Sequence, residues 1–140
     1  MTSPLSPFTV PGSIRFQHCD PAGIAFFARL DELLNAAFED WCAAAGLPFA
    51  TMMRTDRHGF PLVHATIDYR RPLLLGDQIT ITHTVRAVGR SSVTFGVTIT
   101  SANGVCVEGT HIRVFTSLDT HQSVPLPSPL RDALSSVGPL

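Results

Sequence analysis

The chain has no lysine, few cysteines and no long apolar run. Its ten basic residues are all arginine, and with eleven acidic residues the net charge is −1 at pH 7. This balance gives no support to non-specific binding of nucleic acid or of an acidic membrane. Genome composition explains an all-arginine basic set more simply than function does, although arginine is well suited to pairing with phosphate.

Several other absences narrow the class of protein. The three cysteines, Cys19, Cys42 and Cys106, form no CxxC pair, which argues against a disulfide framework and a zinc site. The first twelve residues have no basic start and no apolar run, so we expect no signal peptide. No run approaches the roughly 20 apolar residues that span a bilayer. No GxSxG, Walker or GxGxxG motif occurs. We therefore expect a reduced, soluble, cytoplasmic protein without a metal.

One long helix dominates the predicted structure. At 140 residues the chain is most simply one domain, with loose tails at about 1–12 and 120–140. Apolar residues at 28–45 recur at i, i+3, i+4 and i+7, as on one face of a helix. Gly46 and Pro48 end this helix. The apolar stripe consists of Leu30, Leu33, Leu34, Ala37, Phe38, Trp41 and Cys42.

The rest of the chain favours strands. Alternating apolar and polar residues, many of them β-branched, predict strands that are separated by turns and by a loop at 49–60. A phase change across Gly109 predicts a bulge in the last strand, and residues 129–136 are expected to form one short helix. One helix on an antiparallel sheet is an α+β arrangement. The strands are expected at 13–19, 62–70, 78–88, 91–101 and 105–117.

Asp20 is the strongest candidate for chemistry. It lies between the first predicted strand and the helix. A carboxylate beside backbone N–H groups is an arrangement that acyl transfer uses. Asp-Pro pairs also cap turns and helices. Spacing alone leaves both interpretations open, with the cap as the more common one.

The run Cys-Asp-Pro-Ala-Gly-Ile-Ala-Phe-Phe at 19–27 resembles the signature of the hotdog-fold acyl-CoA thioesterases. It is most similar to the 4-hydroxybenzoyl-CoA thioesterase type and its YbgC-like relatives. Weaker similarities at 70–72, 76–77 and 89–92 extend the resemblance over most of the chain. It implies a hotdog fold, in which a five-stranded antiparallel sheet wraps a long central helix. It also implies hydrolysis of an acyl-CoA thioester to CoA and a carboxylic acid.

The same resemblance assigns roles to residues near the helix start. Asp20 would be the nucleophile or general base, and the backbone N–H of Phe27 would hold the carbonyl oxygen. Gly23 would let the chain and substrate approach closely. Many YbgC-like members have His where this chain has Phe27, so its absence favours an aromatic or bulky acyl group, such as 4-hydroxybenzoyl.

Other residues could complete the site. By the resemblance, a turn with Arg90, Ser91 and Ser92 would bind the nucleotide end of CoA, often from a neighbouring subunit; a solvated turn is an equally good interpretation. His64 could line the acyl pocket, although a half-buried strand histidine is more common. Asn35 could touch a polar substituent of the acyl group, although a surface asparagine is more common.

The resemblance also implies the assembly. Hotdog sites form between subunits, so we expect a homodimer or homotetramer with the active site at the subunit interface. CoA is part of the substrate, and no separate cofactor is expected. Two alternatives remain, namely hydrolysis of an acyl carrier protein thioester and a non-catalytic acyl-CoA-binding domain. A hydratase is a further alternative on this fold, but hydratases usually have a separate Asp/His pair in a loop before the central helix, and this sequence shows no such pair.

Overall fold

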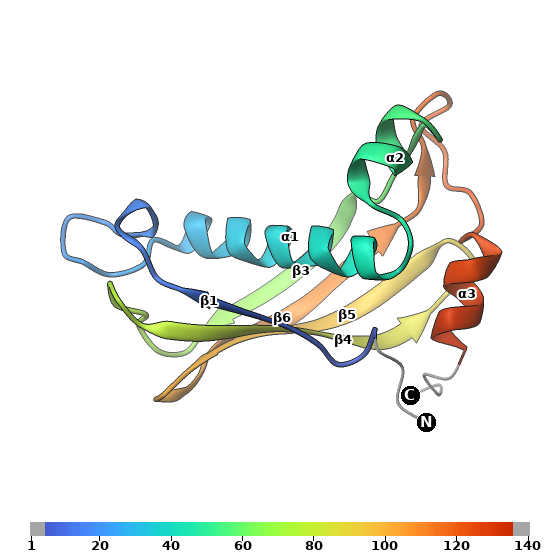
Figure 1. Cartoon of the computed structure of the whole chain (residues 1–140). Coiled ribbons are helices and arrows are strands. Elements are labelled where there is room, and N and C mark those ends of the chain that lie inside the picture. The colour runs from blue at the N-terminus through green and yellow to red at the C-terminus, as the bar shows by residue number, and fades with distance from the viewer. Residues whose placement is uncertain (1–4, 136–140) are drawn as a thin grey trace.

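A single long helix lies across a curved antiparallel sheet (Figure 1). The computed structural model describes residues 5–135. None of the helices in this range is long and apolar enough to cross a membrane. The elements follow one another as β1 (Phe8–Ser13), η1 (Phe16–His18), α1 (Phe27–Ala44), α2 (Phe49–Arg54), β2 (His58–Gly59), β3 (Leu62–Tyr69), β4 (Gln78–Val88), β5 (Ser92–Ser101), β6 (Gly104–Val114), β7 (Thr116–Ser117) and α3 (Ser128–Leu134).

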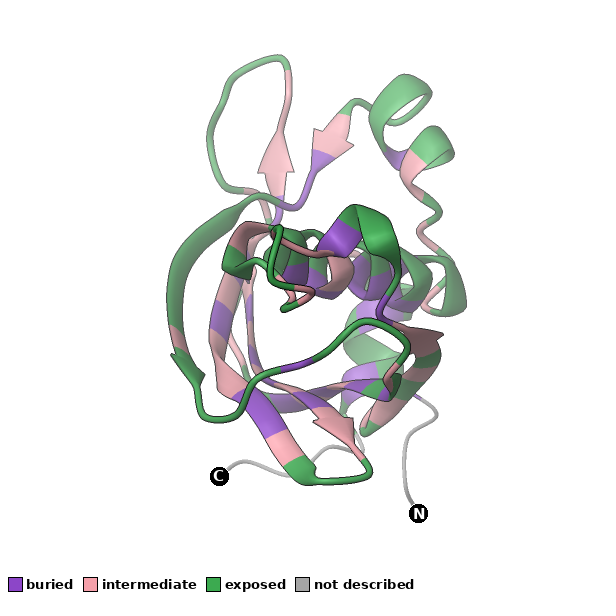
Figure 2. Ribbon diagram, turned by 90° about the vertical axis from the view of Figure 1, so that its left-hand side faces the viewer, coloured by how far each residue is buried: buried purple, intermediate pink, exposed green. Residues whose placement is uncertain are grey.

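The main sheet has the strand order β1-β4-β5-β6-β3, and every neighbouring pair is antiparallel. A second, two-stranded sheet joins β2 to β7. Viewed along α1, the main sheet curves around the helix, and the edge strand β3 is exposed along nearly its whole length (Figure 2). The predicted α+β hotdog architecture, a five-stranded sheet around one helix, is confirmed.

The apolar stripe of α1 forms the centre of the core. Its six buried residues include Phe38 and Trp41, which stack with ring centroids 5.8 Å apart and pack edge-on against Phe95 of β5. Leu33 of the predicted stripe is only half-buried. Because the helix has apolar residues on one face only, that face lies on the sheet and the charged face stays in water.

The start of the chain differs from the prediction. The first strand is Phe8–Ser13 rather than 13–19, and it pairs with β4 along its whole length. Phe16 begins a short 3-10 turn and is 82% exposed, so it does not share a strand face with buried Ile14. Pro11 concealed this strand in the sequence, since proline is tolerated in an edge strand.

The predicted loose tails are also corrected. Leu5 is buried, and its carbonyl accepts a hydrogen bond from the indole of Trp41 at 2.9 Å. Near the other end, α3 buries Leu130 and Leu134 against the core. The predicted helix at 129–136 is therefore present as Ser128–Leu134, while position 136, like 1–4 and 137–140, lies outside the described residues.

Two details of the strands differ as well. The loop predicted at 49–60 contains α2 and β2. The register shift between β5 and β6 lies between Ile99 and Thr100, opposite Cys106, and not at Gly109, which pairs regularly with Val97. Gly109 is required for another reason, because a Cβ atom there would overlap the carbonyl oxygen of Thr66 on β3.

Three polar residues lie in the core between the sheet and α1. His83 is 0% exposed, His111 4% and Arg113 5%. Burial, together with the charge of nearby Arg113, lowers the pKa of both histidines, that of His83 to about 3. Burial also lowers the pKa of Arg113, to about 10, which leaves it charged at neutral pH. Arg113 is therefore the cation of this buried group.

Candidate active site

Asp20 lies in a tight turn between η1 and α1. Its Oδ1 accepts hydrogen bonds from the backbone N–H groups of Ala22 at 2.9 Å and Ile24 at 3.2 Å. Its backbone N–H donates to the carbonyl of Ile24, and its own carbonyl accepts from Gly23. One carboxylate oxygen is thus used in capping the turn. Within residues 5–135 no donor reaches the other oxygen, Oδ2.

Gly23 makes this turn possible. It has φ +78°, a left-handed conformation that glycine adopts without strain. Its carbonyl accepts a hydrogen bond from Leu75, and Ile24 forms a bridge with Leu74. The turn that carries Asp20 is therefore held against the segment that leads into β4.

The turn leads directly into the N-terminus of α1. Phe26 precedes the helix in an extended conformation, and no side chain caps the first turn. Phe27 is the first helical residue, and within residues 5–135 no acceptor is found for its N–H. The start of a helix carries unpaired donors and a partial positive charge, which favour a negatively charged oxygen. The structure thus brings Asp20, Gly23 and Phe27 into one short segment.

Apolar side chains surround this segment on the outside of the chain. The exposed fraction is 55% for Phe27, 48% for Phe26 and 46% for Tyr69 at the end of β3. The rings of Phe27 and Tyr69 lie edge to face with centroids 6.2 Å apart. Leu74 and Leu75 are similarly exposed. Clustered apolar exposure of this kind marks a binding site or a subunit interface.

The remaining predicted site residues lie elsewhere in the same chain. His64 pairs with Ile112 of β6. Its side chain lies on the same face of the sheet as Thr66 and Asp68, away from α1. Asn35 is eight residues beyond Phe27 along α1, about 12 Å away. Its side chain is exposed, and its Oδ1 accepts a hydrogen bond from buried Arg113 at 3.1 Å.

The turn that holds Arg90, Ser91 and Ser92 lies at the far end of β4 from the segment of Asp20. β4 has 11 residues, which corresponds to about 35 Å. The guanidinium of Arg131 on α3 donates to the carbonyls of Gly89 at 2.9 Å and Arg90 at 2.7 Å. This anchors the turn and leaves the Arg90 side chain exposed. Asp20 and this turn cannot meet within one chain.

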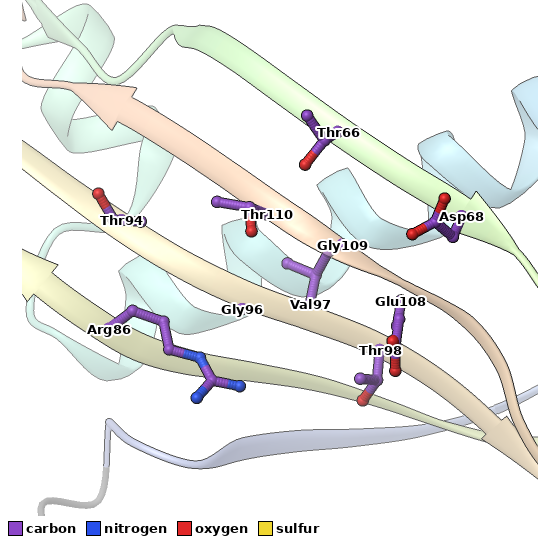
Figure 3. A pocket seen from close by; sticks show the side chains of 10 residues that line it. All are labelled: Thr66, Asp68, Arg86, Thr94, Gly96, Val97, Thr98, Glu108, Gly109 and Thr110. Carbon is purple, nitrogen blue, oxygen red and sulfur yellow. The ribbon is translucent and has the colours of Figure 1, made fainter. Parts of the chain in front are cut away.

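A polar groove of about 560 Å³ lies on the sheet face that points away from α1 (Figure 3). Threonines line it together with Asp68, Glu108 and Arg86, and the Arg86 side chain lies over Gly96. This groove contains neither Asp20 nor a helix end. Within the described residues, no group of three His, Cys, Asp or Glu side chains is arranged to hold a metal ion.

Sequence reasoning missed Tyr69 and Arg113 as candidate functional residues. Tyr69 donates its hydroxyl hydrogen to Asp31 of α1 at 3.1 Å, and burial together with Asp31 raises its pKa to about 12. The one signal for Tyr69 was that it is the only tyrosine in the chain. Arg113 was missed because the phase change predicted across Gly109 placed it on the outer face, whereas regular alternation keeps it on the buried face of Val107.

Comparison with known proteins identifies the superfamily of the chain. The model of the thioesterase-like superfamily matches residues 14–134. The chain belongs to this superfamily. A 1,4-dihydroxy-2-naphthoyl-CoA hydrolase from Synechococcus elongatus is 32% identical over 123 residues, which cover 86% of this chain and 90% of that protein.

Solved structures of similar proteins share the fold of this thioesterase-like chain. A 1,4-dihydroxy-2-naphthoyl-CoA thioesterase from Synechocystis superposes with a TM-score of 0.83, at 23% identity, over 94% of this chain and 98% of that one. A gentisyl-coenzyme A thioesterase superposes with a TM-score of 0.80, at 24% identity, over 91% and 99%. The prediction of a thioester hydrolase is confirmed at the level of the family. The narrower 4-hydroxybenzoyl-CoA subgroup stays a prediction.

Proposed function

We propose that this protein hydrolyses the thioester bond of an aromatic acyl-CoA, releasing CoA and an aromatic carboxylic acid. The proposal rests on the closeness of Asp20 to the N-terminus of α1 at Phe27. Among residues 5–135, one carboxylate oxygen of Asp20 has no donor and no side chain caps this helix end. The similarity to a hydrolase of 1,4-dihydroxy-2-naphthoyl-CoA supports an aromatic acyl group. The 4-hydroxybenzoyl ester is a narrower candidate within the same class.

In the proposed mechanism, the thioester carbonyl oxygen accepts a hydrogen bond from the backbone N–H of Phe27 and lies at the positive end of α1. Negative charge develops on this oxygen as the carbonyl carbon is attacked, so the donor stabilises the transition state more than the ground state. Oδ2 of Asp20 either attacks this carbon or removes a proton from a water molecule that does so. In the first case a mixed anhydride forms, the CoA sulfur leaves, and water then cleaves the anhydride.

We further propose that the active unit is a dimer joined along β3. β3 is an edge strand without proline or glycine, and its residues are exposed except for half-buried Ile67. The other edge, β1, contains Pro11, which cannot donate to a neighbouring strand. An unprotected edge strand is a template for pairing with a second copy, and a two-fold axis makes the two β3 strands antiparallel. A tetramer would require a second contact surface.

Such a dimer would also bring the CoA-binding candidates to the site. The turn at Arg90 and the segment of Asp20 lie at opposite ends of the 11-residue strand β4, and therefore at opposite ends of the subunit. Antiparallel pairing sets this end of one subunit beside the Asp20 end of the other. The exposed guanidinium of Arg90 could then bind a phosphate of CoA across the interface, together with Ser91 and Ser92.

The experiment is a thiol-release assay with benzoyl-, hydroxybenzoyl-, 1,4-dihydroxy-2-naphthoyl-, phenylacetyl- and fatty acyl-CoA esters. The proposal predicts release of free CoA, fastest from aromatic esters. Binding of the esters without thiol release would instead indicate the non-catalytic acyl-CoA-binding domain. Activity only on the corresponding acyl carrier protein esters would indicate the other alternative. In a single turnover in ¹⁸O-water, ¹⁸O in Asp20 would establish the anhydride, because water that attacks the Asp20 carbonyl carbon of the anhydride leaves its oxygen there, whereas direct attack of water on the thioester does not.

A further inference from the structure

A second cavity lies at the end of the molecule where α2, β2 and β7 meet. Its volume is about 370 Å³, which is within the range of small-molecule sites. Most of its wall is apolar, formed by Phe49, Phe60, Pro61 and Leu118. Its polar lining residues are Thr116, His121 and Arg113, and Arg113 is only 5% exposed.

The guanidinium of Arg113 is incompletely paired. Nη1 donates to the carbonyl of Phe60 and Nη2 to Oδ1 of Asn35, both at 3.1 Å. The group lies over the ring of Phe38, 3.8 Å from its centroid. Among residues 5–135, Nε has no acceptor and no carboxylate is within ion-pair distance of the guanidinium. A buried cation without an anion is costly, so this cavity favours a ligand oxygen that accepts hydrogen bonds.

The position of the cavity relative to β3 links it to Asp20. Phe60 and Pro61 line the cavity and directly precede β3, which begins at Leu62. At the other end of β3, Tyr69 contacts Phe27 and Asp31 at the start of α1. Two β3 strands that pair antiparallel place the first residues of one beside the last residues of the other. The Arg113 cavity of one subunit would therefore open toward the Asp20 segment of its partner.

We propose that Arg113 determines substrate specificity in a site shared between two subunits. Asp20 of one subunit acts on the thioester, and the aromatic acyl group extends into the partner's apolar cavity. There Arg113 of the partner subunit donates a hydrogen bond to a hydroxyl oxygen on the aromatic ring. A guanidinium has only donors, so the substituent must accept. This inference rests on the proposed hydrolysis and on the β3 dimer.

The first test compares benzoyl-CoA with its 2-, 3- and 4-hydroxy derivatives and with 1,4-dihydroxy-2-naphthoyl-CoA. The wild type should prefer its best hydroxylated ester over benzoyl-CoA by about 10- to 100-fold in kcat/KM, as expected for a hydrogen bond from a charged donor. Arg113→Met should lower kcat/KM for that ester alone, and Arg113→Lys should restore part of the preference. Arg54→Met, an exposed arginine on α2 outside the cavity lining, should leave both values unchanged.

Two results would overturn this role. One is a wild type that hydrolyses benzoyl-CoA as fast as every hydroxylated ester. The other is an Arg113→Met variant that loses activity on all esters equally while its thermal unfolding midpoint stays near that of the wild type. If Arg113→Met does not fold, Arg113→Lys decides the question, because a shorter cation should reduce the preference without removing the charge.

Mixing variants tests whether the site is shared. Asp20→Asn and Arg113→Met subunits, unfolded and refolded together, should form heterodimers with one fully native site. Random pairing then makes about a quarter of all sites native, so activity on the hydroxylated ester should rise above the average of the two separate variants. If Arg113 served the Asp20 of its own chain, mixing would create no native site and no such rise.

A binding measurement keeps the two proposals separable. The thioether analogues phenacyl-CoA and 4-hydroxyphenacyl-CoA, in which a methylene separates sulfur from the carbonyl, cannot be hydrolysed at the thioester. If the wild type cleaves no ester, hydrolysis is refuted. The Arg113 inference still holds if the wild type binds the hydroxylated analogue more tightly and Arg113→Met does not. Equal binding by the wild type of phenacyl-CoA and of its 2-, 3- and 4-hydroxy derivatives refutes it.

Discussion

Tyr69 at the end of β3 donates a hydrogen bond to Asp31 on α1, with the two oxygens 3.1 Å apart. This bond ties the exposed edge of the sheet to the first turns of the helix whose N-terminus adjoins Asp20. Phe27 packs against the same tyrosine ring. The β3 edge, where we propose dimerisation, is thus in direct contact with the start of α1, beside the Asp20 segment that we propose for catalysis.

A charge in the middle of β3 should break the dimer and the activity together. Ala65 is exposed in the single chain, so Ala65→Asp should leave the subunit folded but place two carboxylates close together across the two-fold axis. Analytical ultracentrifugation should show monomers, and thiol release should fall in parallel. Thr9→Asp on the opposite edge, β1, is the control and should stay dimeric. A monomeric wild type with full activity contradicts the shared site.

Replacing Gly23 should affect catalysis beyond its effect on stability. Gly23 and Gly46 have φ values of +78° and +83°, and a Cβ atom would meet nothing within 4 Å at either position. Alanine at either site should therefore cost about 1 kcal/mol of unfolding free energy through backbone strain alone. Only Gly23→Ala should also lower kcat/KM, because it shifts the turn that holds Asp20. Equal activities of the two variants would show that this turn is not part of the site.

The buried histidines should make the protein sensitive to mild acid. Burial lowers the pKa of His83 to about 3, whereas in the unfolded chain it is near 6.5. Below pH 6.5 the unfolded chain binds a proton that the native state does not, so stability falls as the pH falls from 6.5 toward 3. His83→Met should flatten the decrease in melting temperature between pH 7 and 5, and exposed His121→Gln should not. An unchanged slope in His83→Met contradicts a buried neutral imidazole.

Loss of the Arg90 charge should weaken binding of CoA esters. Arg90→Gln is expected to raise KM about 3- to 10-fold with little change in kcat, because an exposed cation contributes to binding of a phosphate and not to the chemical step. The difference from the wild type should shrink at high salt. Arg29→Gln, an exposed arginine paired with Glu32, serves as the control. A change in kcat alone would assign Arg90 a different role.

Local periodicity was enough to predict most of the fold. The stripe of α1 and the alternation in β3, β4 and β5 predicted elements whose bounds agree with the structure to within one residue at most ends. The strand at Phe8–Ser13 was missed because Pro7 precedes it and Pro11 lies within it, and both prolines indicate a loop. What makes it a strand is its pairing with β4, which local sequence does not record.

The site was predictable only in part. The Asp-Pro-Ala-Gly run identified the turn, and the amphipathic stripe identified the helix that follows it. Spacing could not show that Oδ1 of Asp20 caps the turn while Oδ2 has no donor. Arg113 escaped detection because the phase change predicted across Gly109 does not occur, so regular alternation from Val107 onward places Arg113 on the core face. The first fact depends on which oxygen atom the N–H groups of a short turn reach, and the second depends on pairing between separate strands.

The substitution Asp20→Asn tests the central claim most directly. Asparagine keeps an oxygen that can accept hydrogen bonds from the N–H groups of Ala22 and Ile24. The turn should therefore keep its conformation while the nucleophile or base is lost. Asp77→Asn is the matched control, since this carboxylate also caps a turn, accepting from Leu74 at 2.8 Å. The account predicts that Asp20→Asn lowers kcat for release of CoA from the best aromatic ester by about 10²-fold or more, with an unchanged circular dichroism spectrum, and that Asp77→Asn stays active. An Asp20→Asn protein that hydrolyses this ester at the wild-type rate would contradict it.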